Sequence, residues 1–217
     1  MCALEAAFAK KFPGRTVRCY NFGRGYYFSA QERALFESLL LRGIVPNAAV
    51  FIDGLNEFIY HDGVPQLTPA LFSFTAPDRP PLQRRDLSGE SERAAAVEEM
   101  IARYRANVQL TEAVARAHGV QAIFIGQPVP FLDFPMGPAT YPFPSTFVEH
   151  QLAGWGYARF KQAAREGRFG DSFVWCGNAF AQADRVMYAD SIHYSPWGAE
   201  VLARCIADRI AEAGLLR

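Results

Sequence analysis

Short apolar runs alternate with amphipathic segments along this chain of 217 residues, and this alternation limits the possible folds more than any other feature. The spacing of apolar residues predicts helices over residues 2–12, 31–42, 88–118, 147–167 and 196–213. It predicts strands over residues 16–22, 48–52, 120–125 and 172–176. Strands that alternate with helices favour an α/β fold, in which helices cover both faces of a parallel sheet.

The length fits one α/β domain over residues 1–217, and half of the residues are apolar, which is enough for a substantial core. Two proline-rich stretches, residues 60–87 and 127–146, are expected to be loop-rich insertions. An aromatic group in and beside the second stretch either forms a pocket for an acyl group or a sugar, or packs on itself as a lid. Its members are Phe131, Phe134, Tyr141, Phe143 and Phe147.

The charges balance, with 22 Lys and Arg residues against 22 Asp and Glu, so we expect neither nucleic acid nor a membrane surface as a partner. No apolar run is long enough to span a membrane, and residues 1–11 lack the pattern of a secretion signal. The cytoplasm is therefore the expected location of the chain as given.

The four cysteines lie far apart and form no Cys-x-x-Cys pair, so we expect no zinc site, and we predict no metal or cofactor. Cys19, Cys176 and Cys205 fall in apolar segments and are predicted to be buried thiols.

Parallel sheets bind ligands at the carboxyl ends of their strands, which here selects the loops 23–29, 54–57 and 177–193. The last of these contains Asp190, three residues before His193. The carboxylate can accept the proton of one ring nitrogen and leave the other nitrogen free as a base. The same spacing also suits an Asp that caps a turn beside a half-exposed His.

Two hydrogen-bond donors follow the earlier strands. Gly23 offers a backbone N–H that a ligand can approach closely, and Asn56 offers a side-chain amide. Two donors together with a His–Asp pair suit acyl transfer, in which the donors stabilise an oxyanion and the His activates a hydroxyl.

With these residues in this order, the chain resembles the SGNH (GDSL-type) hydrolases, which are ester hydrolases on a flavodoxin-like sheet. Residues 21–23, Asn-Phe-Gly, are similar to the second block of that family, and residues 54–57, Gly-Leu-Asn-Glu, to its third block, Gly-x-Asn-Asp. Residues 190–193 are similar to the fifth block, Asp-x-x-His.

The resemblance implies hydrolysis of a small-molecule or glycan ester. His193 would be the base and Asp190 its orienting partner. The Gly23 N–H and the Asn56 amide would be the oxyanion donors. Glu57 stands where the family usually has Asp, a mild departure because the Asn is the donor.

The first block of the family, a strand that ends in Gly-Asp-Ser and carries the nucleophile, is absent from this chain. Ser29 is the only early serine near the proposed site, and it is more typical of a helix cap that pairs with Glu32. The resemblance thus leaves two hypotheses. The first is an ester hydrolase that lacks its nucleophile block here, and we expect such a chain to be inactive as given. The second is a pseudo-hydrolase that binds a carbohydrate or an acyl group without turning it over.

The absent block also affects the sheet. In the flavodoxin-like order 2-1-3-4-5, the first strand lies centrally, between the strands predicted at 16–22 and 48–52. Without it, we expect a poorly stable chain, a homodimer that forms across the gap, or direct pairing of those two strands.

Overall fold

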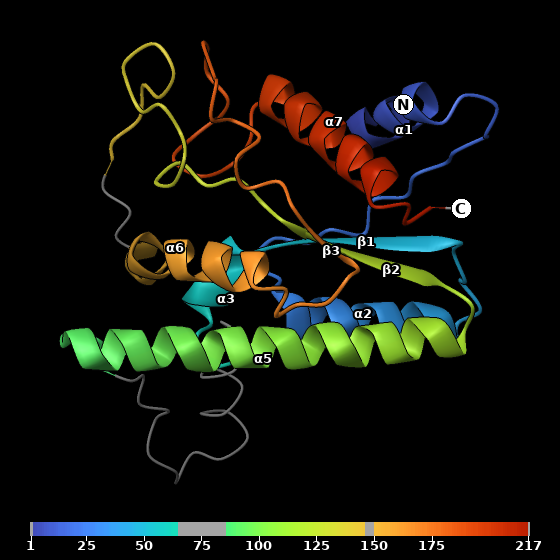
Figure 1. The fold of residues 1–217 in the computed structure, drawn as a ribbon, viewed down its shortest axis with the longest axis horizontal. Coiled ribbons are helices and arrows are strands. Elements are labelled where there is room, and N and C mark those ends of the chain that lie inside the picture. The colour runs from blue at the N-terminus through green and yellow to red at the C-terminus, as the bar shows by residue number, and fades with distance from the viewer. Residues whose placement is uncertain (1, 65–85, 146–149, 217) are drawn as a thin grey trace, which may run out of the picture.

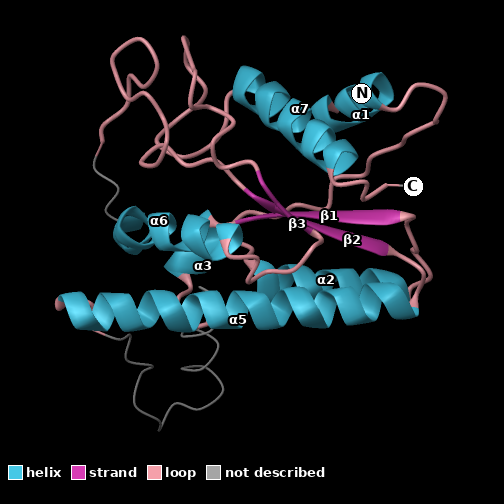
Figure 2. Ribbon diagram, in the orientation of Figure 1, coloured by secondary structure: helices cyan, strands magenta, loops and turns pink. Residues whose placement is uncertain are grey.

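Three parallel strands form one sheet in the computed structural model, which describes residues 2–64, 86–145 and 150–216 (Figures 1 and 2). They are β1 (Ala48–Asp53), β2 (Gln121–Gly126) and β3 (Phe173–Trp175), in the order β1-β2-β3. Ala48 pairs with Gln121, and Phe124 pairs with Phe173. The predicted α/β class is confirmed, and the order matches that of the last three strands of a flavodoxin-like sheet.

Helices cover both faces of the sheet (Figure 1). One face carries α1 (Ala3–Lys11) and α7 (Pro196–Glu212), which lie against each other. The other face carries α2 (Ser29–Leu41), α3 (Leu55–Ile59), α5 (Glu90–Ala117) and α6 (Gln151–Arg165).

The central strand β2 supplies both hydrophobic cores. Its residues Ala122 and Phe124 belong to the core beneath α5, whereas Ile123 and Ile125 belong to the core beneath α7. This division follows from the geometry of a strand, in which successive side chains point to opposite faces. Burying a side chain such as Ile123 stabilises the fold by about 1.5–3 kcal/mol, so β2 holds the two layers together.

The segment between α1 and α2 corrects one prediction. Residues 12–28 contain turns but neither helix nor strand, so the strand predicted over residues 16–22 is wrong. The Cys19 N–H donates to the Glu5 carboxylate at 2.9 Å, and Tyr20 and Phe22 are 75% and 45% exposed. The apolar run therefore contacts α1 through a side chain and does not enter the sheet.

The edge of β1 that faces away from β2 consequently has no strand partner among the residues that the structure describes. The direct pairing considered above is wrong, because residues 16–22 form no strand, and β1 is an edge strand of the described sheet. Ile52 of β1 is 38% exposed, which is consistent with an edge strand.

The cysteines of the second core also differ from expectation. Cys176 follows β3, Cys205 lies on α7, and the two are joined by a disulfide with their Cα atoms 6.0 Å apart. The prediction that they are thiols is therefore wrong. The disulfide ties the last strand to the last helix.

The two predicted insertions have different outcomes. Most of the first, residues 65–85, lies outside the described residues, whereas residues 127–145 of the second form neither helix nor strand.

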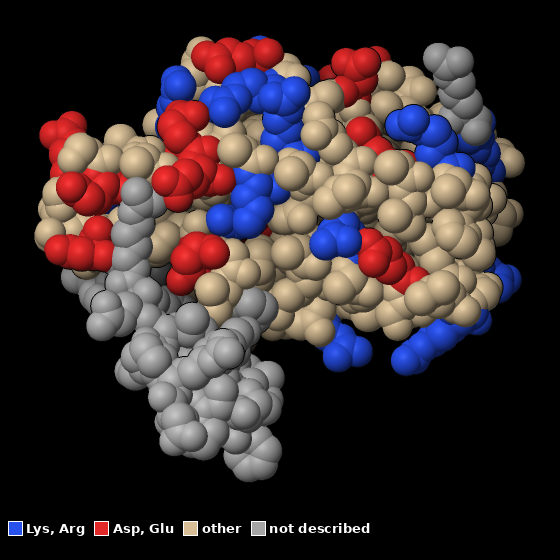
Figure 3. Space-filling model, turned by 90° about the horizontal axis from the view of Figure 1, so that it is seen from below, with Lys and Arg blue, Asp and Glu red and all other residues tan. Residues whose placement is uncertain are grey.

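No helix within the described ranges combines the length and the apolar character that a bilayer crossing requires. On the α5 side, acidic and basic side chains lie next to one another (Figure 3), as in the pairs that Glu98 forms with Arg159 and Arg168.

Candidate functional site

Asp190 and His193 form a hydrogen-bonded pair in the loop between β3 and α7. His193 Nδ1 lies 2.7 Å from Asp190 Oδ2, within the range expected for an oriented imidazole. The other carboxylate oxygen, Oδ1, accepts the backbone N–H groups of Ile192 at 2.9 Å and His193 at 2.8 Å. The Asp thus caps its own turn and binds the ring at the same time, so both sequence interpretations describe part of the geometry.

These hydrogen bonds act on the carboxyl group of Asp190. Burial acts to raise its pKa, but the backbone N–H groups of His193 and Ile192, followed by the His193 ring, lower the pKa to about 2. Asp190 is therefore ionised at neutral pH. A carboxylate only accepts hydrogen bonds, which assigns the proton between the two residues to His193 Nδ1. Nε2 is then the unprotonated nitrogen of the neutral ring.

Two tyrosines fix this loop at the carboxyl end of the sheet. The Tyr194 hydroxyl donates to the carbonyl of Pro128, which lies just beyond the end of β2, at 2.8 Å. The Tyr141 hydroxyl donates to the Ser191 carbonyl, also at 2.8 Å. The His193 side chain stays 74% exposed on this anchored loop, so the ring is held by its partner while its other edge faces solvent.

The two expected oxyanion donors lie in other loops and already have partners. Asn56, in α3 directly after β1, donates through Nδ2 to the Tyr27 carbonyl at 2.7 Å. The Gly23 N–H donates to Asn21 Oδ1 at 2.8 Å. In the described part of the chain, no hydrogen bond connects either donor to the Asp190–His193 pair. Their role as oxyanion donors stays a prediction.

Ser29 is buried and bonded on several sides. Its N–H donates to Glu57 Oε1 at 2.5 Å, its hydroxyl bonds Glu57 Oε2 at 3.1 Å, and Asn107 donates to Ser29 Oγ at 2.9 Å. The N-cap of α2 is Phe28, whose side chain makes no capping hydrogen bond. The capping box predicted for Ser29 and Glu32 is therefore wrong. Ser29 anchors α2 to α3 and α5 and is poorly placed to attack a substrate.

Three carboxyls gather at this contact, a group that the sequence did not predict: Asp53 and Glu57 are buried, and Glu32 is partly buried. Burial first, and then the Asp53 charge, raises the pKa of Glu57 to about 8, although Ser29 and Arg103 act to lower it. Burial likewise raises the pKa of Glu32 to about 7, and that of Asp53 lies well above its usual value. Asp53 and Glu57 flank the Gly-Leu-Asn motif in sequence, but only the fold brings Glu32 to them.

The described aromatic residues of the second insertion pack on one another and on neighbouring rings. Phe134, Tyr141 and Tyr188 make edge-to-face contacts, with ring centroids 5.2–6.2 Å apart. Phe143 joins them through Tyr141, and Phe131 packs against Tyr157. This arrangement favours the self-packing interpretation. Phe147 lies outside the described residues.

No protein-family model matches the chain, and no curated protein sequence matches it. Among solved structures, the chain is similar to a catalytic mutant of Axe2, an acetylxylan esterase from Geobacillus stearothermophilus, at a TM-score of 0.48 and 15% sequence identity. The similarity covers 100% of this chain and 84% of that chain. A likeness of this size carries no argument about function, which therefore depends on the geometry of the chain's own residues.

Proposed function

We propose that the chain is an ester hydrolase domain of the SGNH type, in which His193 is the general base and Asp190 orients it. The observation that carries the proposal is the 2.7 Å bond from Nδ1 to an ionised carboxylate on a ring that is 74% exposed. The bond fixes one ring nitrogen, and the exposure leaves Nε2 open to a substrate at the carboxyl end of the sheet.

In the proposed reaction, Nε2 removes a proton from a water molecule, in place of the absent serine, as the water oxygen bonds to the ester carbonyl carbon. The carbonyl oxygen gains the negative charge. The C=O bond then re-forms as the bond from the carbonyl carbon to the alcohol oxygen breaks, and the protonated ring gives its proton to the departing alkoxide. Asn56 keeps one amide hydrogen beyond its bond to the Tyr27 carbonyl. To act as the second donor, the Gly23 N–H would have to break its hydrogen bond to Asn21 Oδ1 and donate to the oxyanion instead.

The test compares the wild type with His193→Ala on an acetylated oligosaccharide and on 4-nitrophenyl acetate. Turnover of the sugar ester is the decisive measurement, because a free imidazole attacks activated aryl esters such as 4-nitrophenyl acetate without an enzyme site. We expect His193→Ala to abolish turnover of the sugar ester. His118→Ala, which removes an exposed imidazole at the end of α5, serves as the matched control and should leave turnover unchanged. Equal turnover by the wild type and His193→Ala would exclude the assigned base.

A second candidate function, a binding protein that does not turn over esters, is favoured by the position of Ser29. Its hydroxyl is bonded to Glu57 and Asn107, so the serine that the sequence offered near the site does not supply a nucleophile to His193. A fluorophosphonate probe distinguishes the two functions. Labelling of any serine that disappears in His193→Ala supports the hydrolase. A chain that binds the acetylated oligosaccharide, resists the probe and leaves the ester intact supports the binding protein.

A further inference from the structure

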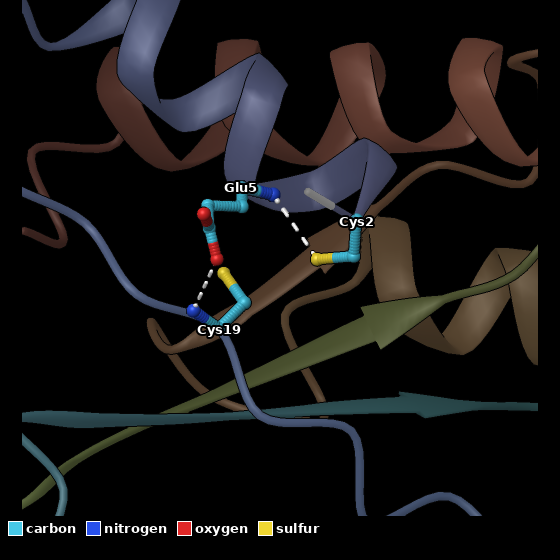
Figure 4. A group of neighbouring side chains, drawn as sticks. All are labelled: Cys2, Glu5 and Cys19. Carbon is cyan, nitrogen blue, oxygen red and sulfur yellow. Dashed lines mark hydrogen bonds between the residues drawn. The ribbon is translucent and has the colours of Figure 1, made fainter.

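Three potential metal ligands converge at the start of α1: Cys2 and Glu5 lie three residues apart, and Cys19 approaches them from beyond the end of the helix (Figure 4). The Cys2 and Cys19 sulfurs and a Glu5 carboxylate oxygen all lie within 4.8 Å of one another. Cys2 caps α1 and accepts the Glu5 N–H at 3.4 Å, and the Glu5 carboxylate accepts the Cys19 N–H at 2.9 Å. Both cysteines are free in the structure.

The set fits a soft divalent cation. Thiolates and a carboxylate bind zinc at about 2.0–2.3 Å, so two ligands on one tetrahedral ion lie about 3.5–3.8 Å apart. Small side-chain rotations would bring the three atoms from within 4.8 Å to that spacing. Cys2 is exposed at the start of α1, which gives an ion access to the site.

We propose that Cys2, Glu5 and Cys19 bind one Zn²⁺ ion, with a water molecule as the fourth ligand. Binding releases the two thiol protons to solvent and leaves the carboxylate ionised, so no oxidant or reductant takes part. The site escapes sequence analysis because Cys2 and Cys19 lie on opposite sides of α1 in the chain, without a short-spaced motif.

The consequence is structural. Residues 12–28 contain neither helix nor strand, and the Cys19 N–H donates to the Glu5 side chain on α1. Two metal–thiolate bonds would tie this segment to α1, which itself packs on α7. Because Gly23 lies four residues beyond Cys19, the ion would also restrict the segment that carries this glycine.

Cobalt tests the ligand set, because Co²⁺ in a thiolate site gives charge-transfer absorption in the near ultraviolet and intense visible bands when tetrahedral. The full chain, stripped of metal by a chelator, is titrated with Co²⁺ and then with Zn²⁺. We expect saturation at one equivalent and loss of the bands when Zn²⁺ replaces Co²⁺. The charge-transfer band should be lost in the double variant Cys2→Ser/Cys19→Ser. Affinity should fall roughly tenfold or more in Glu5→Gln.

Glu90→Gln is the matched control, because Glu90 is likewise an acidic residue in the first turn of a helix and has no cysteine beside it in α5. It should bind Co²⁺ as the wild type does.

A second measurement needs no variant. Zn²⁺ should protect Cys2 and Cys19 of the wild type from alkylation, and mass spectrometry of the peptides that contain each cysteine measures the extent of alkylation. The proposal is overturned by a thiolate band that persists in the double variant, by no band at all, or by a Cys2–Cys19 disulfide that forms while Zn²⁺ gives no protection.

Discussion

At the scale of single residues, Asp190 uses its two carboxylate oxygens for different tasks. Oδ1 accepts the Ile192 and His193 N–H groups and shapes the turn, whereas Oδ2 holds the imidazole. Substitutions can separate these tasks, because Asn keeps an oxygen for the backbone but loses the charge beside the ring, and Ala loses both.

We therefore expect Asp190→Ala to accelerate amide exchange at Ile192 and His193, and Asp190→Asn to leave that exchange close to wild type. Both variants should lower kcat for the sugar ester with little change in KM, because the ring loses its charged partner. Hydrogen exchange followed by NMR, together with steady-state kinetics, measures the two effects. Equal exchange in both variants would show that Oδ1 does not shape the turn.

The buried carboxyl of Glu57 predicts an unusual dependence of stability on pH. Burial raises its pKa in the folded protein from 4.5 to about 8, so the folded state keeps a proton that the unfolded chain releases between these values. Stability is then highest below the unfolded pKa and is lost as the pH rises through the folded pKa. Each such group contributes a slope of up to about 1.4 kcal/mol per pH unit. Glu32, with its pKa raised to about 7, adds to the slope at the lower end of the range.

Thermal unfolding between about pH 5.5 and pH 8 measures this slope. We expect the wild type to melt at a lower temperature as the pH rises, and Glu57→Gln to reduce the effect, because the amide stays neutral and still accepts the Ser29 N–H. Glu90→Gln replaces an exposed glutamate and should keep the wild-type slope. Stability that rises with pH in this window would contradict the raised pKa values.

The sequence revealed those site contacts that are local. Asp190 and His193 are three residues apart, so a motif alone predicts their hydrogen bond. The contact of Ser29 with Glu57 spans 28 residues, and the approach of Cys19 to Glu5 spans 14. Such contacts depend on how helices dock, which residue spacing within one segment does not encode.

At the scale of elements, strands and helices with strong periodicity were predicted to within a few residues. The observed β1 and β2, Ala48–Asp53 and Gln121–Gly126, agree with the predicted 48–52 and 120–125. The five residues of α3, Leu55–Ile59, are too few to show a helical period. Residues 16–22 have a strand-like pattern, but a strand also needs a partner, which the pattern does not specify.

The surroundings of two helical glycines, Gly198 and Gly154, predict opposite effects on stability when each glycine is replaced by alanine. A Cβ on Gly198, in the first turn of α7, would lie 2.1 Å from the Met187 carbonyl oxygen, a backbone atom that cannot move without shifting the loop. A Cβ on Gly154, in α6, would meet no atom within 4 Å.

We expect Gly198→Ala to destabilise the protein by about 1–3 kcal/mol through overpacking. Gly154→Ala should stabilise it by about 0.5–1 kcal/mol, because alanine lowers the entropy cost of the helix. Chemical denaturation of both variants gives the comparison. If both substitutions stabilise, α7 does not begin against the carbonyl of Met187.

At the scale of the whole molecule, the sheet has an unprotected edge. β1 has no strand partner on its outer side within the described ranges, and unpaired edges readily pair with another chain. Apolar side chains lie exposed along and just before this strand, at Ile44, Val45 and Ile52. The formal net charge of +0 produces no long-range repulsion between copies, and charges of both signs share the face seen in Figure 3.

We therefore expect two copies to associate through their β1 edges into a continuous sheet of both chains, in a concentration-dependent equilibrium that sedimentation velocity can follow. Ile52→Lys places a charge on the strand and should shift the equilibrium toward the monomer, because pairing would then bury an unpaired ammonium group. Leu110→Lys makes the same change at a side chain that is 51% exposed on α5, on a helix rather than at the strand edge, and should leave the equilibrium unchanged. A wild type that stays monomeric at high concentration would show that the β1 edge does not recruit a second copy. A dimer that Leu110→Lys disrupts and Ile52→Lys preserves would instead place the contact on the α5 face.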